Sequence, residues 1–220
     1  SAKMATATQD ATLQIFSGDI GDTQGVAPLA VVPVKSSLNF TILGSTVLPS
    51  VVTGKKTVSI PRNRIFTVRW SGTRYLPGVD GVISLTHTTS TKKYRYGQMQ
   101  FRAVKAATLG YRIEVTNSVR LSDEYLWGVS EVPSSWPEAA LQAQAIASRT
   151  YAMSKAGIYR ASCDCDLYGE ISDQSFLGYA KEIEKGWGQF WKAAVTNTAG
   201  LTITQEGKPI TAYFGSSTGG

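Results

Sequence analysis

The sequence is poor in the side chains that most often bind metals or act as bases near neutral pH. Its 220 residues include one histidine and two cysteines. Cys163 and Cys165 flank a single aspartate, and without a nearby histidine they form a poor zinc site. His87 lies far upstream in a β-like segment, so Ser–His and Cys–His catalysis has no evident base. We therefore expect no metal ion and no cofactor, and a structural role for His87.

The two cysteines leave a choice between a disulfide and free thiols. An oxidising location favours a disulfide between Cys163 and Cys165, although a ring closed through one intervening residue is strained and more easily reduced. The disulfide is the pairing we expect.

Long hydrophobic runs are also absent. No run approaches the roughly 18–20 apolar residues that a membrane-spanning helix needs, so no membrane span is predicted. The first residues, Ser1-Ala-Lys-Met-Ala, lack the apolar core of a signal peptide. A cytosolic protein normally begins with methionine, so the sequence fits either a processed, exported chain or a trimmed one.

Acidic residues are scarce in the first half of the chain. Residues 1–110 hold 13 Lys/Arg against 4 Asp/Glu, whereas residues 111–220 hold 9 against 12. Eleven basic residues and one acid lie between Lys55 and Lys105. Such a field favours a polyanion, or is a solvated basic face. No RNP sequence or Cys/His finger is present, so nucleic acid is not a predicted partner.

The first half is predicted to be mostly β, because short β-prone runs alternate with turn residues. A change of character near residue 90 predicts a β-rich module over 1–90 and a second module over 91–220. The predicted strands cover residues 13–16, 29–34, 40–43, 57–60, 65–70, 81–85, 99–104 and 111–115.

Glu131 is the carboxylate that the sequence singles out. It follows the apolar run Tyr125-Leu-Trp-Gly-Val129 and precedes Val132-Pro133. Pro133 disfavours helix at the residue before it, so Glu131 is predicted to lie on an extended or turning segment. A carboxyl that acts as a catalytic acid near neutral pH needs apolar surroundings, which the neighbouring valines and tryptophans could supply. The alternative is an exposed glutamate on a turn.

A long helix follows. Ser135 and Glu138 fit a capping box, with Pro137 in the first turn. Residues 139–154 contain no glycine or proline and many alanines, which predicts a helix that packs closely and ends near Ala156-Gly157. A loop is expected to about residue 178, then a helix over 185–194 with its aromatic side chains on the apolar side. Residues 195–204 and 209–214 are predicted as a final strand pair.

Five motifs in order resemble the SpoIID/LytB domain of bacterial cell-wall proteins, from about Tyr94 to Gly220. They are Tyr125-Leu-Trp-Gly-Val129, Glu131-Val-Pro-Ser-Ser-Trp-Pro137, Leu141-Gln-Ala-Gln-Ala-Ile-Ala-Ser-Arg-Thr-Tyr-Ala152, Asp173-Gln-Ser-Phe-Leu-Gly178 and Pro209-Ile-Thr-Ala-Tyr-Phe-Gly-Ser-Ser-Thr-Gly-Gly220. The resemblance implies an α+β fold, in which a β-rich N-terminal half precedes a mixed α/β domain built around the alanine-rich helix. Members of this family continue beyond the last motif, so we expect the C-terminal part of the domain to be missing here.

The resemblance also implies a chemistry. Members with known activity are lytic transglycosylases that cut peptidoglycan glycan strands, and others enhance cell-wall amidases. It assigns Glu131 as the acid/base. Some members bind zinc beside the fourth motif, but Asp173 stands where one of their cysteines would be expected. The residues expected to bind substrate are Gln144, Arg149, Gln174, Tyr213, Ser216 and Ser217.

Three hypotheses follow for a secreted or cell-wall protein. The first is cleavage of glycan strands by lytic transglycosylation, with the basic N-terminal half attaching to anionic wall polymer. The second is a non-catalytic glycan-binding module that stimulates a cell-wall amidase. The third is a structural β protein of the cell surface. Purely structural roles are the alternative for these site residues. Arg149 could pair with a structural acid, and the final motif could be an ordinary strand end followed by a Ser/Gly turn. Tyr151 is expected to belong to the hydrophobic core.

Overall fold

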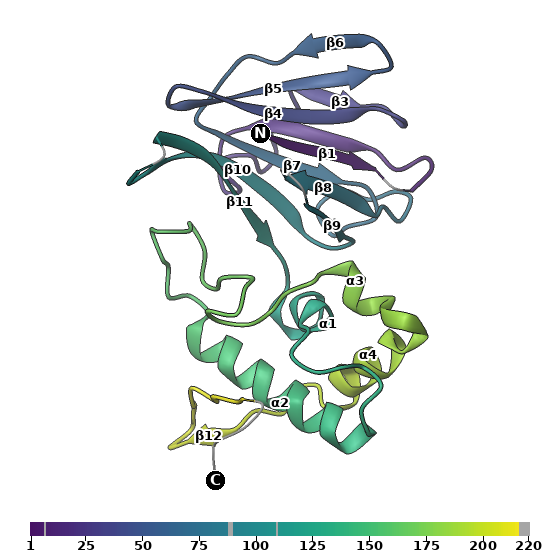
Figure 1. The fold of residues 1–220 in the computed structure, drawn as a ribbon, viewed down its shortest axis with the longest axis vertical. Coiled ribbons are helices and arrows are strands. Elements are labelled where there is room, and N and C mark those ends of the chain that lie inside the picture. Colours follow the sequence, from purple (N-terminus) through teal and green to yellow (C-terminus); the bar gives the residue numbers. More distant parts are fainter. Residues whose placement is uncertain (7, 88–89, 109, 216–220) are drawn as a thin grey trace. The chain divides into compact units, whose positions relative to one another are not determined.

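The computed structural model describes residues 1–6, 8–87, 90–108 and 110–215, which form two compact units, Ser1–Val119 and Arg120–Gly220 (Figure 1). The first is built of strands and the second mainly of helices, so the predicted α+β class is confirmed. The division lies later than the expected module boundary at residue 90, which falls at the first residue of a strand in the first unit. The physical reason is pairing, because residues 98–106 hydrogen-bond to residues 65–70 of the same sheet.

The first unit is a sandwich of two antiparallel sheets. One has the strand order β6-β5-β4-β1-β8-β9 and the other β11-β10-β7-β2-β3. The strands of the described residues are β1 (Ala2–Thr6), β2 (Leu13–Ser17), β3 (Ala30–Val32), β4 (Ser37–Leu43), β5 (Thr46–Thr53), β6 (Lys56–Ser59), β7 (Ile65–Trp70), β8 (Ile83–His87), β9 (Ser90–Tyr94), β10 (Gln98–Ala106) and β11 (Gly110–Ser118).

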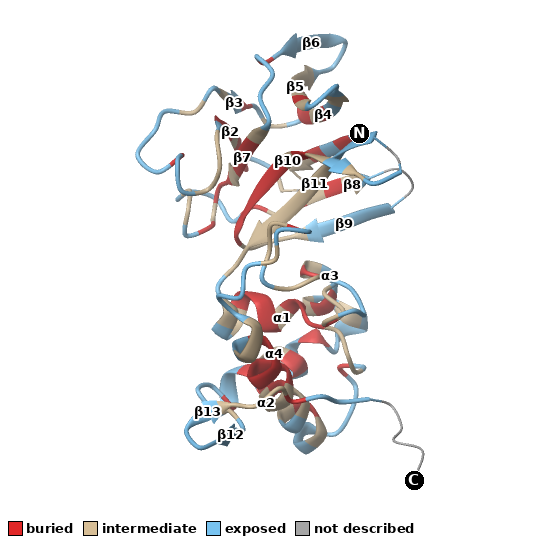
Figure 2. Cartoon of the chain, turned by 90° about the vertical axis from the view of Figure 1, so that its left-hand side faces the viewer, coloured by how far each residue is buried: buried red, intermediate tan, exposed pale blue. Residues whose placement is uncertain are grey.

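The core of this unit lies between the two sheets and is formed by buried side chains of both. Figure 2 shows the buried residues of these strands in red. Phe40 of β4 stacks on Phe101 of β10 with ring centroids 3.8 Å apart, so the sheets are in direct contact. Trp70 is fully buried, and its indole nitrogen donates to the carbonyl of Arg95. Burial of these large side chains is the main source of the unit's stability.

All eight predicted strands are present, but the sequence pattern missed β1, β5 and β9. β5 contains Pro49 and β9 carries two lysines, features that lower strand propensity. Both nevertheless pair along their length, β5 with β4 and β9 with β8. Tertiary pairing therefore overrides local preference in these strands.

The second unit packs short helices around one long helix (Figure 1). No helix in the described ranges is both long enough and apolar enough to cross a membrane. The elements of this unit are η1 (Leu121–Tyr125), α1 (Leu126–Gly128), α2 (Glu138–Lys155), α3 (Tyr179–Glu182), η2 (Glu184–Gly186), α4 (Gly188–Asn197), β12 (Thr204–Gln205) and β13 (Lys208–Pro209).

The long predicted helix is α2, but the predicted capping box is wrong. Pro137 is the N-cap residue, and no side chain caps the helix. A proline suits this place because it has no N–H to leave unpaired. Glu138 instead accepts a hydrogen bond from Gln142 one turn later, at 2.8 Å. The predicted end is confirmed, since Ala156 caps the helix and Gly157 has a positive φ of 79°.

The segment after residue 184 departs from its prediction. The helix runs over Gly188–Asn197 rather than 185–194, and only Trp191 of its aromatic residues points inward. The predicted strand over 195–204 is wrong, because α4 continues into it and a turn follows. The predicted strand over 209–214 is reduced to β13, which pairs with β12 in a short hairpin. Packing of Trp191 against α1, where it donates to the Leu126 carbonyl at 2.8 Å, decides which face of α4 is buried.

Candidate functional site

Glu131 lies on a turn formed by residues 128–134, called here the Glu131 turn. Its backbone pairs with a segment more than forty residues later in the chain. Leu177 donates to the Gly128 carbonyl and Ser130 donates to the Ser175 carbonyl, each at 2.8 Å. The Ser175 N–H then donates to Oε1 of Glu131 at 2.6 Å. Glu131 is half-buried and lies on a bend, as the proline after Val132 predicted. One oxygen of its carboxylate is therefore positioned by a main-chain N–H of the paired segment.

Close packing beside this turn depends on a glycine. A Cβ added at Gly128 would lie 2.4 Å from a ring carbon of Phe176, so only glycine fits without rearrangement. The Phe176 ring stacks on Tyr125, with centroids 5.5 Å apart and planes 5° from parallel. The Gly128–Phe176 approach thus sets the spacing of the two paired segments.

Gln174 lies behind the turn rather than on its surface. It is fully buried, and its Oε1 accepts a hydrogen bond from the Tyr125 hydroxyl at 3.0 Å. Its Nε2 is buried with no hydrogen-bond partner in the described part of the chain. Burial, and then the nearby charges of Asp173 and Glu131, raise the pKa of Tyr125, so this phenol stays a proton donor. Gln174 is therefore a buried residue that is hydrogen-bonded to Tyr125, next to the segment that pairs with the Glu131 turn.

Asp173 is a fully engaged carboxylate. Its two oxygens accept hydrogen bonds from Arg160 at 2.6 and 3.0 Å, from Tyr151 at 2.7 Å and from the Tyr168 N–H at 2.8 Å. Burial alone would raise the pKa of Asp173, but these hydrogen bonds and the Arg160 charge outweigh it and lower the pKa. Burial and the bond to Asp173 raise the pKa of Tyr151 to about 12. The Asp173 charge is thus balanced by Arg160 inside a hydrogen-bonded cluster. Tyr151 is buried, as expected.

A buried lysine holds the residues that follow Glu131. Lys181 is 1% exposed, and its ammonium donates to the Val132 carbonyl at 2.6 Å and to Glu184 at 2.7 Å. The same Glu184 oxygen accepts from the Ser134 hydroxyl at 2.6 Å. Burial would raise the pKa of Glu184, but the bonds from Lys181 and Ser134 lower it. Sequence reasoning missed this pair; its three-residue spacing in α3 and η2 was the available signal.

Among the described residues, no hydrogen bond joins the two predicted residues on α2 to this turn. Gln144 is half-buried and donates to Ser148 at 3.0 Å. Arg149 is 2% exposed, and its guanidinium donates to the carbonyls of Val195 and Leu201 at 2.9 and 3.0 Å. Burial lowers the pKa of Arg149, and carbonyl oxygens at the end of α4 stabilise its charge. Arg149 therefore ties α2 to α4, through carbonyls rather than through an acid.

Of the predicted site residues near the C-terminus, Ser216 and Ser217 lie outside the described residues. Tyr213 is 82% exposed, on a segment that is not a strand, and its ring lies 6.2 Å from that of Tyr151. Tyr213 is therefore next to Tyr151, whose hydroxyl donates to Asp173.

The cysteines form a disulfide between Cys163 and Cys165, as the sequence favoured. Arg160 donates its backbone N–H to the Cys165 carbonyl at 2.9 Å, so the disulfide loop adjoins the arginine that binds Asp173. Within the described ranges, no group of three or more His, Cys, Asp or Glu residues is arranged to hold a metal ion. His87 ends β8, in the other unit.

Comparison with known proteins agrees with this arrangement. Residues 110–205 match the family model SpoIID, stage II sporulation protein. A stretch of 91 residues is 33% identical to a Bacillus subtilis (strain 168) protein named Amidase enhancer. That match covers 41% of this chain and 11% of the relative, so the chain spans a small part of the relative's length. The interval that matches the family model, residues 110–205, contains Glu131, the paired Asp173–Leu177 segment and the Lys181–Glu184 pair. Residues 110–205 thus belong to the SpoIID family, as the ordered motifs indicated.

Proposed function

We propose that the second unit cleaves peptidoglycan glycan strands by lytic transglycosylation, with Glu131 as the acid and then the base. One observation carries the proposal: Glu131 accepts a hydrogen bond from the Ser175 N–H and forms no ion pair among the described residues, while two nearby carboxylates are paired with basic side chains. Asp173 is bound by Arg160, and Glu184 is bound by Lys181.

This distribution of charge supports a single-acid mechanism. Hydrolysis by the usual retaining or inverting routes needs two carboxyl groups placed across the glycosidic bond. Asp173 accepts four hydrogen bonds and its side chain is 2% exposed, so it cannot serve as a free nucleophile or base. Lytic transglycosylation needs one protonating group, because a hydroxyl of the sugar itself replaces water.

The proposed steps use only the carboxyl group of Glu131. Glu131 gives its proton to the glycosidic oxygen as the bond to the anomeric carbon breaks. The carboxylate that remains takes the proton from the sugar's 6-hydroxyl as that oxygen attacks the anomeric carbon, which leaves a 1,6-anhydro end. Oε1 is held by Ser175, so the proton would be carried on Oε2. A fixed carboxyl of this kind provides general acid–base catalysis.

The surroundings of the turn suit a sugar polymer. Trp136 is 49% exposed five residues after Glu131, and Tyr213 is exposed on the side where Tyr151 packs. Amphipathic aromatic side chains of this kind offer an apolar face together with a hydrogen-bonding tip. Gln144 adds a half-buried amide on α2. We include these residues, with Ser216 and Ser217, in the proposed glycan-binding surface.

The alternative function is a glycan-binding module that stimulates a cell-wall amidase. The observation that favours it is the 33% identity over 91 residues to the Bacillus subtilis protein named Amidase enhancer. Under either proposal the protein acts outside the cell on the wall, where a disulfide between Cys163 and Cys165 persists.

The experiment that separates them is mass spectrometry of purified glycan strands, with and without stem peptides, after incubation with the chain. Glu131→Gln removes the proton and keeps the shape of the side chain. Glu138→Gln is the matched control, because Glu138 is an exposed carboxylate at the start of α2. A form extended past Gly220 is run beside the 220-residue chain.

We expect 1,6-anhydro ends from wild type and Glu138→Gln, and at least a hundredfold less product from Glu131→Gln, in line with the ~10²–10⁴ contributed by a positioned acid. Reducing ends in place of anhydro ends would refute transglycosylation and indicate hydrolysis. If the strands bind, no form yields product, and an added amidase is accelerated equally by wild type and Glu131→Gln, the enhancer function is correct.

A further inference from the structure

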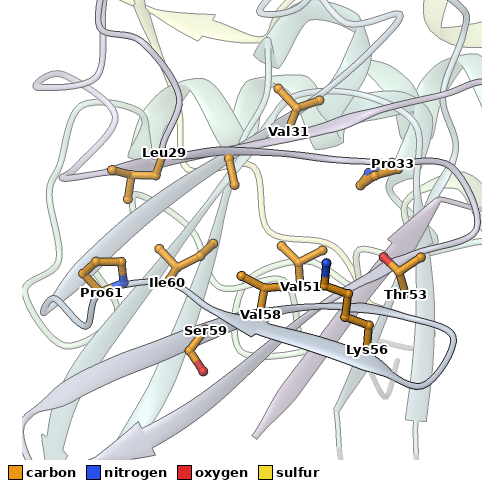
Figure 3. Close-up of a pocket in the computed structure, with 11 residues that line it drawn as sticks. Leu29, Val31, Pro33, Val51, Thr53, Lys56, Val58, Ser59, Ile60 and Pro61 are labelled. Carbon is orange, nitrogen blue, oxygen red and sulfur yellow. The ribbon is translucent and has the colours of Figure 1, made fainter.

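The first unit contains an open groove that the proposed function does not use. It has a volume of about 570 Å³ and lies between β3 and the β5–β6 hairpin (Figure 3). β3 is the last strand of one sheet and β6 the last strand of the other, so the groove lies where the sandwich is left open between two sheet edges. This location is independent of the SpoIID segment and of Glu131.

The groove presents apolar side chains to solvent. Leu29, Val31 and Val58 are 48%, 52% and 50% exposed, and they line its two sides. Val51 and Ile60 lie between them (Figure 3). Contiguous exposed apolar side chains in a concave site mark a binding surface more often than isolated ones do.

The β6 edge also offers unpaired backbone groups. Ile60 donates to the Pro49 carbonyl at 2.9 Å, and Val51 and Val58 are direct partners in the ladder. Hydrogen-bonded pairs alternate along an antiparallel ladder, so the residues between, Thr57 and Ser59, direct their N–H and C=O groups away from β5. No strand of the described residues pairs with this edge. An extended peptide can add to such an edge.

The charge around the groove selects the partner. Residues 23–79 contain seven Lys/Arg and no Asp or Glu. Lys56 lines the groove, Lys55 precedes it in the exposed turn, and Lys35 follows Pro33 on the opposite side. A second copy of this chain would bring like charges together, whereas an acidic segment would be attracted.

We propose that this groove binds an extended, acidic peptide segment of a partner protein by strand addition to β6. Apolar side chains of the peptide enter between Val31 and Val58, and acidic residues at the end of the peptide nearest the β5–β6 turn are attracted to Lys55 and Lys56. Main-chain hydrogen bonds to Thr57 and Ser59 supply register. The interaction would attach the unit to a partner without involving the Glu131 turn.

The test is fluorescence anisotropy of the full chain with a labelled synthetic peptide in which valine and glutamate alternate. Peptides with lysine for glutamate, or serine for valine, are the ligand controls. Val58→Asp places a repelling charge in the groove, and Val79→Asp is its control at a 49% exposed valine outside it. Thr57→Pro removes the outward N–H, a change that an edge strand tolerates. Circular dichroism checks that each variant is folded.

We expect the acidic peptide to bind wild type and Val79→Asp, and at least tenfold weaker binding for Val58→Asp, for Thr57→Pro and for the serine peptide. Equal binding by Thr57→Pro would overturn strand addition, and equal binding by Val58→Asp would overturn the groove as the site. Concentration-dependent dimerisation that Val58→Asp abolishes, with no peptide binding, would make a second copy the occupant. If only an anionic polymer such as polyglutamate without valine binds, the site is electrostatic and the proposal is wrong.

Discussion

Replacing Lys181 by methionine tests whether the Glu131 turn depends on the ammonium group behind it. The ammonium is 1% exposed and bonds to the Val132 carbonyl and to Glu184. Removing one partner of a buried ion pair costs about 3–5 kcal/mol. The Glu184 side chain is 31% exposed and keeps its bond from Ser134, so solvent offsets part of this cost. We expect the free energy of unfolding of the second unit to fall by about 2–3 kcal/mol.

The assay is urea unfolding followed by tryptophan fluorescence, since four of the five tryptophans lie in the second unit. Lys208→Met, at an exposed lysine on β13, is the control. The double variant with Glu184→Gln removes the charge left behind and should recover about half of the loss. A change for Lys181→Met within about 0.5 kcal/mol of the control would refute the reasoning, because it would place the pair among weak exposed ones.

Three further predictions concern buried contacts of the second unit. Gly128→Ala forces a Cβ into Phe176 and should cost about 1–3 kcal/mol in the free energy of unfolding, whereas Gly169→Ala, with its nearest neighbour at 3.6 Å, should change it by less than about 0.5 kcal/mol; equal effects in thermal unfolding would contradict the packing argument. Arg149→Met removes the donor to the Leu201 carbonyl and the buried bond to the Val195 carbonyl, and should cost about 1–3 kcal/mol, while glycan cleavage per folded molecule, measured by product mass spectrometry, stays within about twofold if the residue is structural. Asp173 has a pKa below its ordinary 3.8, so its contribution to stability is present above that value and is lost as pH falls through the lowered one. Asp173→Asn should therefore destabilise strongly at neutral pH and progressively less in acid, and a pH-independent difference in urea midpoints would count against this assignment.

The location of Glu131 on a turn could be predicted from the sequence because its cause is local. Pro133 disfavours helix at the residue before it. The alanine-rich run and Gly157 fix a helix and its end for similarly local reasons, and alternation gave strands such as 65–70 with the observed bounds. The ordered motifs located the family segment without any knowledge of contacts.

What surrounds Glu131 was decided only by tertiary structure. The bonds from Ser175 to Glu131 and from Lys181 to Val132 join residues 44 and 49 positions apart, and the direction of Arg149 depends on a carbonyl 52 positions away. Local propensity carries no information about such pairs, because packing of whole helices and strands selects them. The apolar groove has the same origin. The sequence by itself determined the turn at Glu131, the helix α2 and eight of the strands, because their causes are local, whereas tertiary pairing decided β5 and β9 and the order of strands in the two sheets determined which edges remain open.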